Sequence, residues 1–273
     1  MKSCFYFINE REIRLNSPIK WVGGKSRMVK KMIPLIPNHK GYVEVFGGAA
    51  YLLFGKDRSN WEIVNDLDNG LMNFWFVVKN AKEEFLNSFK YTLISRETFN
   101  DYKKKWKTGN IHDSIERAHV FYYLVNAGFG ADMKNPVFGT KKDKFPLQLD
   151  KIHRDIDEAY ERIKTVVIEQ LDFRKCIEKY DSDDTFFYID SPYRNTKEYA
   201  VGKFTDNDYE DLYRICKNCK GKWLYTINND EYIRDLFKEF NIINHEVYYS
   251  VCKTNSGRQE FKELIITNYD ITE

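Results

Sequence analysis

Apolar runs and helical periodicities alternate along the first third of the chain. Residues 41–46 and 61–64 form two short, mainly apolar runs, which predict strands. We expect one helix to begin within 49–54 and another to cover 68–79, where apolar side chains recur at helical spacing. A strand, a glycine turn, a helix and a second strand that ends in an acid together predict a βαβ unit of the nucleotide-binding kind.

The middle of the chain has no strand alternation. Residues 82–124 are predicted to be helical, a loop rich in Gly, Asn and Lys follows at 126–145, and another helix covers 149–163. A stripe of apolar side chains at helical spacing supports the first of these helical segments. The pattern therefore predicts a helical insertion rather than additional sheet.

The last third of the chain returns to strands and helices. Strands are predicted at 166–168, 185–189 and 222–226, helices at 206–219 and 230–239, and a closing hairpin from the runs 243–251 and 261–267. The predicted fold class is α/β, with a Rossmann-like mixed sheet, a C-terminal antiparallel hairpin and a helical insertion domain. The predicted domains are a catalytic domain made of 1–80 and 165–273, and the insertion, 81–164.

Composition and charge limit the kinds of partner and site. Aromatic residues make up 16% of the 273 residues, which is typical of a globular chain. The formal net charge is +2, so a basic surface for a polyanion must be local. No segment resembles a secretion signal or a membrane span, and five cysteines, an odd number, favour reduced thiols in a cytoplasm. Cys216 and Cys219 lack a second Cys or His pair at matching spacing, so no metal site is predicted.

The predicted strand 185–189 runs directly into Asp190-Ser191-Pro192-Tyr193. Open α/β sheets bind ligands at the carboxyl ends of their strands, and Pro192 forces the chain to leave the sheet there. The Asp190 carboxylate and the Ser191 carbonyl can accept the two hydrogens of an exocyclic base amine. Tyr193 can stack on a base that has swung out of a duplex. In the alternative interpretation, Asp190 caps its own turn and Tyr193 belongs to the core.

Two further loops carry candidate binding residues. Phe46 and Gly48 lie in a glycine-rich turn after the first predicted strand, where backbone can approach a ligand closely. Asp66 ends the next strand, where a carboxylate can accept hydrogen bonds from ribose hydroxyls. Trp21 and Lys25 flank two glycines, so the ring can pack on a nucleoside while the ammonium meets a carboxylate or phosphate. The alternative for this last loop is a helix start with a core Trp.

In this order, the motifs resemble the Dam-like DNA adenine methyltransferases, the alpha-ordered amino-methyltransferases. Lys20 to Lys25 match the family's K-W-x-G-G-K motif, and Phe46 with Gly48 matches its F-x-G-x-G turn. Asp66 matches the acidic residue that closes the family's second strand, and Asp190 to Tyr193 match its D-P-P-Y motif. The resemblance runs from Ser17 to about Tyr269. The chain departs at Ala50, where the family has a glycine, and at Ser191, where it has a proline. Neither departure removes a reactive group, although Ser191 is expected to loosen the turn.

The resemblance implies a cofactor, a substrate and a set of site residues. The cofactor is S-adenosylmethionine, and its methyl group would move directly to the N6 amine of a flipped adenine in double-stranded DNA. The predicted cofactor-binding residues are Trp21, Gly24, Lys25, Phe46, Gly48, Asp66 and Asp190. The predicted catalytic residues are Asp190, Ser191, Pro192 and Tyr193. The insertion 81–164 would be the target-recognition, DNA-binding part.

Basic residues concentrate in this insertion. Between Asp101 and Arg154 there are eleven Lys or Arg and six Asp or Glu. The lysines around 103–107 are interpreted as a solvated helix face. The predicted DNA-binding residues are Lys134, Lys141, Lys142 and Lys144 of the loop, Asn126 as a base reader, and Lys253 and Arg258 at the hairpin tip. Amides at Asn135 and Gln148 are further candidate base readers.

Other functions stay open from the sequence. The same turn can hold the N4 amine of cytosine, and a non-catalytic DNA-binding relative or an RNA or protein methyltransferase would also fit. The predicted partners are double-stranded DNA, no membrane, and a cognate restriction endonuclease as a candidate. The chain is expected to be cytoplasmic and to act as a monomer.

Overall fold

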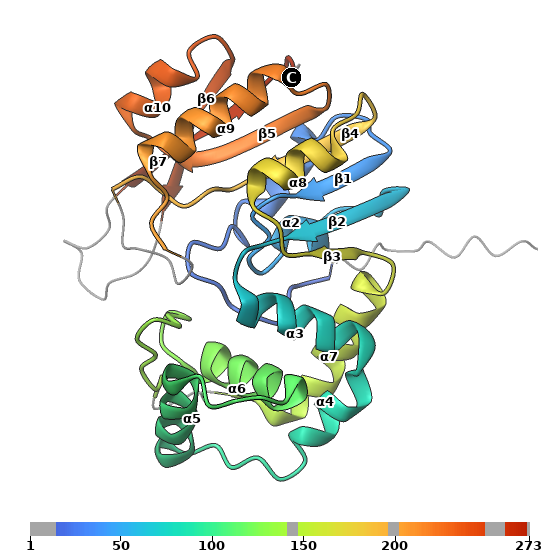
Figure 1. The fold of residues 1–273 in the computed structure, drawn as a ribbon, viewed down its shortest axis with the longest axis vertical. Coiled ribbons are helices and arrows are strands. Elements are labelled where there is room, and N and C mark those ends of the chain that lie inside the picture. Colours follow the sequence, from blue (N-terminus) through green and yellow to red (C-terminus); the bar gives the residue numbers. More distant parts are fainter. Residues whose placement is uncertain (1–14, 141–146, 196–201, 249–259, 272–273) are drawn as a thin grey trace, which may run out of the picture.

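The strands of the chain form one seven-stranded sheet in the computed structural model, which describes residues 15–140, 147–195, 202–248 and 260–271 (Figure 1). In sheet order the strands are β3 (Val167–Glu169), β2 (Trp61–Asn65), β1 (Gly41–Glu44), β4 (Thr185–Ile189), β5 (Lys222–Asn228), β7 (Glu260–Thr267) and β6 (Asn241–Tyr248). The strands from β3 to β5 are parallel, whereas β7 runs antiparallel to both β5 and β6. The predicted mixed sheet with a C-terminal antiparallel hairpin is confirmed.

The carboxyl ends of the parallel strands meet at one edge of this sheet. Every residue of β1 and β4 is buried, as expected for central strands with neighbours on both sides. Glu44 at the end of β1 lies in register with Val64 of β2 and Tyr188 of β4. The segments after these strands are therefore neighbours, and they begin with Asp66 after β2 and Asp190 after β4.

Alternate residues of each strand pack against different helical layers. Val43 and Phe187 face one layer, whereas Tyr42 and Phe186 face the other. The first layer contains α8 (Phe173–Tyr180), α9 (Asp206–Asn218) and α10 (Glu231–Leu236). The second contains α1 (Val29–Met32) with its 3-10 extension η1 (Ile33–Leu35), α2 (Tyr51–Gly55) and α3 (Asn69–Asn80). Both faces of the sheet are thus covered by helices.

A helical region lies beside the sheet, at the lower end of the view in Figure 1. It contains α3 and four further helices, α4 (Lys82–Ser88), α5 (Arg96–Thr108), α6 (Ser114–Ala127) and α7 (Leu149–Ile163). Every residue from 118 to 127 in α6 is buried, with α3, α4 and α5 packed around it. Ser95 and Asp113 cap α5 and α6, so the predicted helical segment 82–124 is three helices. The core runs from α6 through α3 to the sheet, and an insertion boundary at residue 81 stays a prediction.

Helix α8 is an element that the sequence analysis missed. It buries Phe173, Cys176 and Ile177 at helical spacing, and the Asp172 side chain caps its N-terminus by accepting from Arg174 N. These signals are present in the sequence, but they extend over only eight residues. A short helix of this kind depends on the sheet surface that it covers more than on its own propensity.

A buried ion cluster joins the last helix of the helical region to the sheet. Arg162 of α7 binds Glu62 of β2 through two nitrogens, at 2.5 and 2.9 Å, and it also donates to the Leu53 carbonyl at 3.0 Å. Lys56 Nζ lies 2.6 Å from the same carboxylate. Burial opposes the charge of Glu62, but the hydrogen bonds from Arg162 and Lys56 hold its pKa below the ordinary value. The two parts of the molecule are therefore fixed to each other by paired charges.

We predict that Arg162→Met lowers the free energy of unfolding by about 3 kcal/mol, because methionine keeps the packing but leaves a buried carboxylate with one cation fewer. Urea denaturation followed by circular dichroism measures this change. Arg154→Met is the control, since Arg154 pairs with Asp155 on the exposed side of α7 and should contribute under about 1 kcal/mol. Equal effects of the two substitutions would contradict the prediction.

Candidate active site

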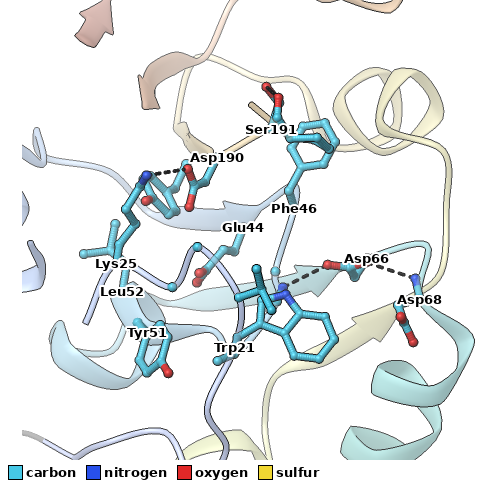
Figure 2. A pocket seen from close by; sticks show the side chains of 18 of the residues that line it. Trp21, Lys25, Glu44, Phe46, Tyr51, Leu52, Asp66, Asp68, Asp190 and Ser191 are labelled. Atoms are coloured by element: carbon cyan, nitrogen blue, oxygen red, sulfur yellow. Dashed lines mark hydrogen bonds and ion pairs between the residues drawn. The ribbon is translucent and has the colours of Figure 1, made fainter. Parts of the chain in front are cut away.

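A pocket lies at the carboxyl edge of the sheet, with an empty volume of about 800 Å³ that includes its open mouth (Figure 2). Its walls come from loop 21–25, the ends of β1 and β4, the glycine turn after β1, and the turn after β2. The predicted cofactor-binding residues Trp21, Gly24, Lys25, Phe46, Gly48, Asp66 and Asp190 all line it. So do the predicted catalytic residues Ser191, Pro192 and Tyr193. The predicted cofactor-binding residues and the predicted catalytic residues therefore line one and the same pocket.

The turn that begins at Asp190 is held mainly by side chains of β5 and α9. Its hydrogen bonds are from Thr226 Oγ1 to Asp190 Oδ1 (2.9 Å), between the hydroxyls of Ser191 and Tyr225 (2.8 Å), from Tyr209 Oη to the Pro192 carbonyl (2.8 Å), and from Arg194 N to Asn228 Oδ1 (3.1 Å). Three of these four supports come from one strand, β5. The turn is consequently a rigid extension of the sheet.

Ser191 compensates for the proline that the resemblance led us to expect. It is only 2% exposed, and its bond to the Tyr225 hydroxyl is one that a proline side chain cannot make. The expectation that Ser191 loosens the turn is therefore corrected, because a buried side-chain hydrogen bond replaces the restriction of a proline ring. The backbone carbonyl of Ser191 is unaffected by the change of side chain.

Lys25 lies deep in the pocket and contacts Asp190, the carboxylate that is predicted to be catalytic. Its ammonium is 3.3 Å from Asp190 Oδ1 and 3.1 Å from Glu263 Oε1, and it donates to the Tyr193 hydroxyl. The Lys25 side chain is 2% exposed. Burial raises the pKa of Asp190, and the Lys25 charge opposes that shift. Lys25 also lines the pocket, so its expected contact with a ligand stays a prediction beside its pairing with the two carboxylates.

The glycine turn combines a strained backbone with a carboxylate. Gly48 adopts φ +50°, and a Cβ there would come 2.8 Å from Trp21 Cδ1, so only glycine fits beneath that ring. Asp66 Oδ2 accepts from Gly48 N, and its Oδ1 accepts from Asp68 N, both at 2.9 Å. Burial raises the pKa of Asp66 to about 6. Ala50 takes the left-handed conformation at φ 53°, so it keeps the backbone shape that the family's glycine would adopt.

Two acidic residues of the site escaped the sequence analysis. Glu44 of β1 lines the pocket, and burial raises its pKa to about 8, so it is mostly uncharged at neutral pH. Its Oε2 accepts from the Tyr42 hydroxyl at 2.9 Å and from Leu53 N at 3.2 Å. Glu263 of β7 is fully buried. In each case the available signal was an acid within an otherwise apolar strand.

A second hollow adjoins the pocket and shares Phe46, Asp66 and Pro192 with it. Three aromatic rings line it, with centroids 5.4 to 5.8 Å apart, from Phe46, Phe173 and Phe204. Asp172 at the start of α8 lies on its rim. The two hollows therefore share a wall, and both are lined by aromatic and acidic side chains.

The residues predicted to bind DNA have mixed outcomes. Lys141, Lys142, Lys144, Lys253 and Arg258 lie outside the described residues. Lys134 is exposed on the loop that follows α6.

Asn126, predicted as a base reader, is 8% exposed, and its amide donates to the Pro18 carbonyl at 3.4 Å. Lys20 Nζ donates to the Asn126 carbonyl at 2.7 Å. Asn126 therefore links α6 to the loop before the pocket, and we no longer treat it as a base reader.

The lysines of α5 support the loop after α6. Lys103 donates to the Pro136 carbonyl at 2.7 Å, and Lys107 donates to Asn135 Oδ1 at 3.0 Å. The loop is also closed by backbone bonds, with Phe129 N donating to the Val137 carbonyl at 2.7 Å. Lys104, Lys105 and Lys107 are exposed, in agreement with a solvated face, and Lys103 and Lys107 in addition fix the loop. Asn135 is engaged in the same support.

In the described part of the chain, the acidic residues, histidines and cysteines are not grouped as metal ligands. No group of three or more His, Cys, Asp or Glu there could hold a metal ion. Cys216 is buried, and the Cys219 thiol donates to Asp181 Oδ1 at 3.0 Å. None of the described helices is both long and apolar enough to cross a bilayer.

Sequence comparisons connect this geometry to known proteins. Type II methyltransferase M.CviBI of Paramecium bursaria Chlorella virus NC1A is 26% identical over 261 residues, covering 92% of this chain and 98% of that protein. Type II methyltransferase M1.LlaDCHI of Lactococcus lactis subsp. cremoris is 25% identical over 286 residues, covering 96% and 98%. The DNA adenine methylase of Vibrio cholerae is 23% identical over 269 residues, covering 90% and 94%.

A family-level match decides between the alternatives that the sequence left open. Residues 21–251 match the family described as D12 class N6 adenine-specific DNA methyltransferase. The match includes loop 21–25, the glycine turn and the turn at Asp190, which the structure brings into one pocket. It favours adenine over cytosine as the base, and an enzyme over a protein that only binds DNA. The chain belongs to the D12 class of N6 adenine-specific DNA methyltransferases, the Dam family.

Proposed function

We propose that this N6-adenine DNA methyltransferase binds S-adenosylmethionine in the pocket beneath Asp190 and holds the adenine amine at the Asp190–Tyr193 turn. The family uses this cofactor. The single observation that carries the proposal is the position of Asp190, which ends the central strand, faces the pocket and is paired with Lys25. That position lets one carboxylate border both ligands.

The donors and acceptors of the pocket fit this cofactor. Asp66 accepts from Gly48 N with one oxygen and from Asp68 N with the other, which fixes its carboxylate in the wall of the pocket where it can accept from a ribose hydroxyl. Gly48, where a Cβ would clash with Trp21, lets the indole ring pack directly against the glycine turn in the wall of the pocket. The acidic lining suits a cationic sulfonium, and Phe46 offers an aromatic face for the purine ring.

The chain's own groups would prepare the adenine amine for attack. The Asp190 carboxylate and the Ser191 carbonyl accept its two hydrogens, which favours a pyramidal and more nucleophilic nitrogen. Burial raises the pKa of Asp190, and the Lys25 charge opposes this shift and so favours the charged, accepting form. The Tyr193 ring covers the face of the flipped base. The cofactor would supply an electrophilic methyl group, with the N–C bond to the amine forming as the S–C bond breaks. The Asp190 carboxylate, which holds one hydrogen of the amine, would accept the proton that the amine loses.

The surface that would meet DNA includes the loop after α6. Phe129 is 64% exposed near its base, and Lys134 is exposed on the same loop. Bonds from Lys103 and Lys107 hold this loop on α5. An anchored loop that carries an exposed ring and a cation fits contact with bases and phosphates. On this basis we assign target recognition to the helical region. Lys141, Lys142 and Lys144, which lie outside the described residues, keep their proposed role in DNA binding.

The biological setting is part of the proposal. Two of the relatives are type II methyltransferases, so we propose a cognate restriction endonuclease as a functional partner of this chain. We also propose that the chain acts as a monomer, as expected from the sequence. Modified-base sequencing of DNA from an expressing host reports the recognition site, and light scattering of the enzyme with DNA reports the stoichiometry.

Asp190→Asn is predicted to reduce methyl transfer at least a hundredfold, about the effect of losing one preorganised electrostatic contact. Asparagine has the same size, but its NH₂ group would oppose the hydrogens of the amine. Incorporation of labelled methyl groups into mixed-sequence duplex DNA, followed by nucleoside analysis, measures transfer and identifies N6-methyladenine.

The matched control for this test is Asp184→Asn, at the opposite end of β4. Asp184 pairs with Lys40 on the surface, so transfer should stay at the wild-type rate. Near-normal transfer by Asp190→Asn would contradict the assignment of Asp190. Methyl groups found on cytosine N4 alone would contradict the assignment of the base.

Asp66 gives a prediction about pH. Its pKa of about 6 means that the carboxylate is charged above that pH and loses accepting capacity below it. Affinity for S-adenosylmethionine should therefore fall as the pH falls through about 6. Asp66→Asn should weaken binding about tenfold to a hundredfold at pH 7.5, the range for a hydrogen bond to a charged group, and should remove this pH dependence.

Isothermal titration calorimetry between pH 5 and pH 8 measures both effects. The control is Asp157→Asn, because Asp157 of α7 pairs with Lys82 of α4 and neither residue lines the pocket. It should bind with wild-type affinity and the wild-type pH profile. An unchanged profile in Asp66→Asn would show that another group titrates.

A further inference from the structure

Glu263 is a buried carboxylate that the transfer mechanism described above does not use. It lies on β7, opposite Asn228 of β5, and its side chain is fully buried. Its Oε1 is 3.1 Å from Lys25 Nζ and accepts a hydrogen bond from the Tyr193 hydroxyl. A charge without exposure to water is costly unless it is paired. Both of its contacts described here are residues that we assign to the active site.

The first consequence concerns the orientation of Tyr193. Its hydroxyl donates to Glu263 and accepts from Lys25, and the Lys25 ammonium also lies 4.4 Å from the centre of its ring. The far end of the ring is thus fixed by two charged groups. The ring is attached to the backbone on one side, and its hydroxyl is held by Glu263 and Lys25 on the other. Its side chain therefore has fewer orientations before a base arrives, so less conformational entropy is lost on binding.

The second consequence concerns the charge near Asp190. Lys25 is shared between Asp190, at 3.3 Å, and Glu263, at 3.1 Å. After burial, the pKa of Asp190 is lowered by Lys25 and raised by Glu263. Three further titratable groups, Glu44 on β1, Tyr188 on β4 and Tyr225 on β5, also lie within electrostatic range of Asp190. Glu263 is the one among these that contacts both Lys25 and Tyr193.

We propose that Glu263 is a positioning residue for methyl transfer, which orients Tyr193 and divides the charge of Lys25 between itself and Asp190. This proposal rests on the function proposed above. It assigns to the antiparallel strand β7 a direct part in the transfer step, because β7 brings the carboxylate under a turn that follows the parallel strand β4.

The substitution Glu263→Gln tests the proposal on the full-length enzyme. We expect kcat to fall at least tenfold, while KM for S-adenosylmethionine changes less than threefold. The acid limb of the kcat profile should move to lower pH, since removing the Glu263 charge lets Asp190 stay ionised in more acidic solution. Glu62→Gln is the matched control, because Glu62 is also a buried, cation-paired carboxylate of this sheet but lies outside the pocket. It should reduce thermal stability without moving the acid limb.

Tyr193→Phe provides a second and independent test. It keeps the ring and the Glu263 charge but removes the hydroxyl that joins them, so kcat should again fall about tenfold. If Glu263 acts through that hydroxyl, the double variant should be little slower than the slower single variant. Losses that multiply would overturn this linkage. If Glu263→Gln does not fold, an unchanged kcat in Tyr193→Phe would overturn the proposal.

The comparison with Glu62→Gln and the activity of the wild-type enzyme also test the proposals. The proposal is wrong if Glu263→Gln behaves as Glu62→Gln does, with lower stability and an unmoved acid limb. A wild-type enzyme that transferred no methyl group to adenine would instead contradict the proposed function, because that result does not depend on Glu263. Thermal melting of every variant, measured alongside the kinetics, separates loss of fold from loss of transfer.

Discussion

The buried ammonium of Lys25 lies between two carboxylates, and the arrangement of the site depends on it. Asp190 and Glu263 come from different strands, and both are within 3.3 Å of this one cation. Without it, two like charges would be confined close together in a region of low dielectric. The turn at Asp190 and the loop that carries Lys25 are therefore held at one relative position, although they are far apart in sequence.

The sheet order explains how these groups meet. The parallel strands end at one edge, which gives Asp66 and Asp190 to the same pocket. The reversed strand β7 enters between β5 and β6, so its middle passes beside the carboxyl end of β5, where Asn228 supports the turn. The helical region is fixed to the opposite side of the pocket through Asn126 and Trp21, and to the sheet through Arg162.

Much of this fold could be predicted from the sequence because its strands are buried and its glycine turn and acids stand at characteristic places. Trp21, Lys25, Gly48, Asp66 and Asp190 were all found in this way, since each belongs to a local motif. Glu263 could not be placed, because the sequence around it does not indicate that its side chain contacts Lys25.

Asn126 was misjudged for a similar reason. An amide in a loop-like segment resembles a base reader until its partner, the Pro18 carbonyl, is known. Helix α8 was missed because a short segment gains its stability from the surface it covers. In each case the missing information was a contact between distant segments.

The pairing of Lys25 with Glu263 spans 238 residues, so the site has a very high contact order. During synthesis, the loop that carries Lys25 leaves the ribosome long before β7 does. An incomplete chain can form the first βαβ unit and its glycine turn, yet its ammonium still lacks one of its two carboxylates. Assembly of the centre is therefore a late event in folding, because the pair of Lys25 with Glu263 can form only after the reversed strand has entered the sheet.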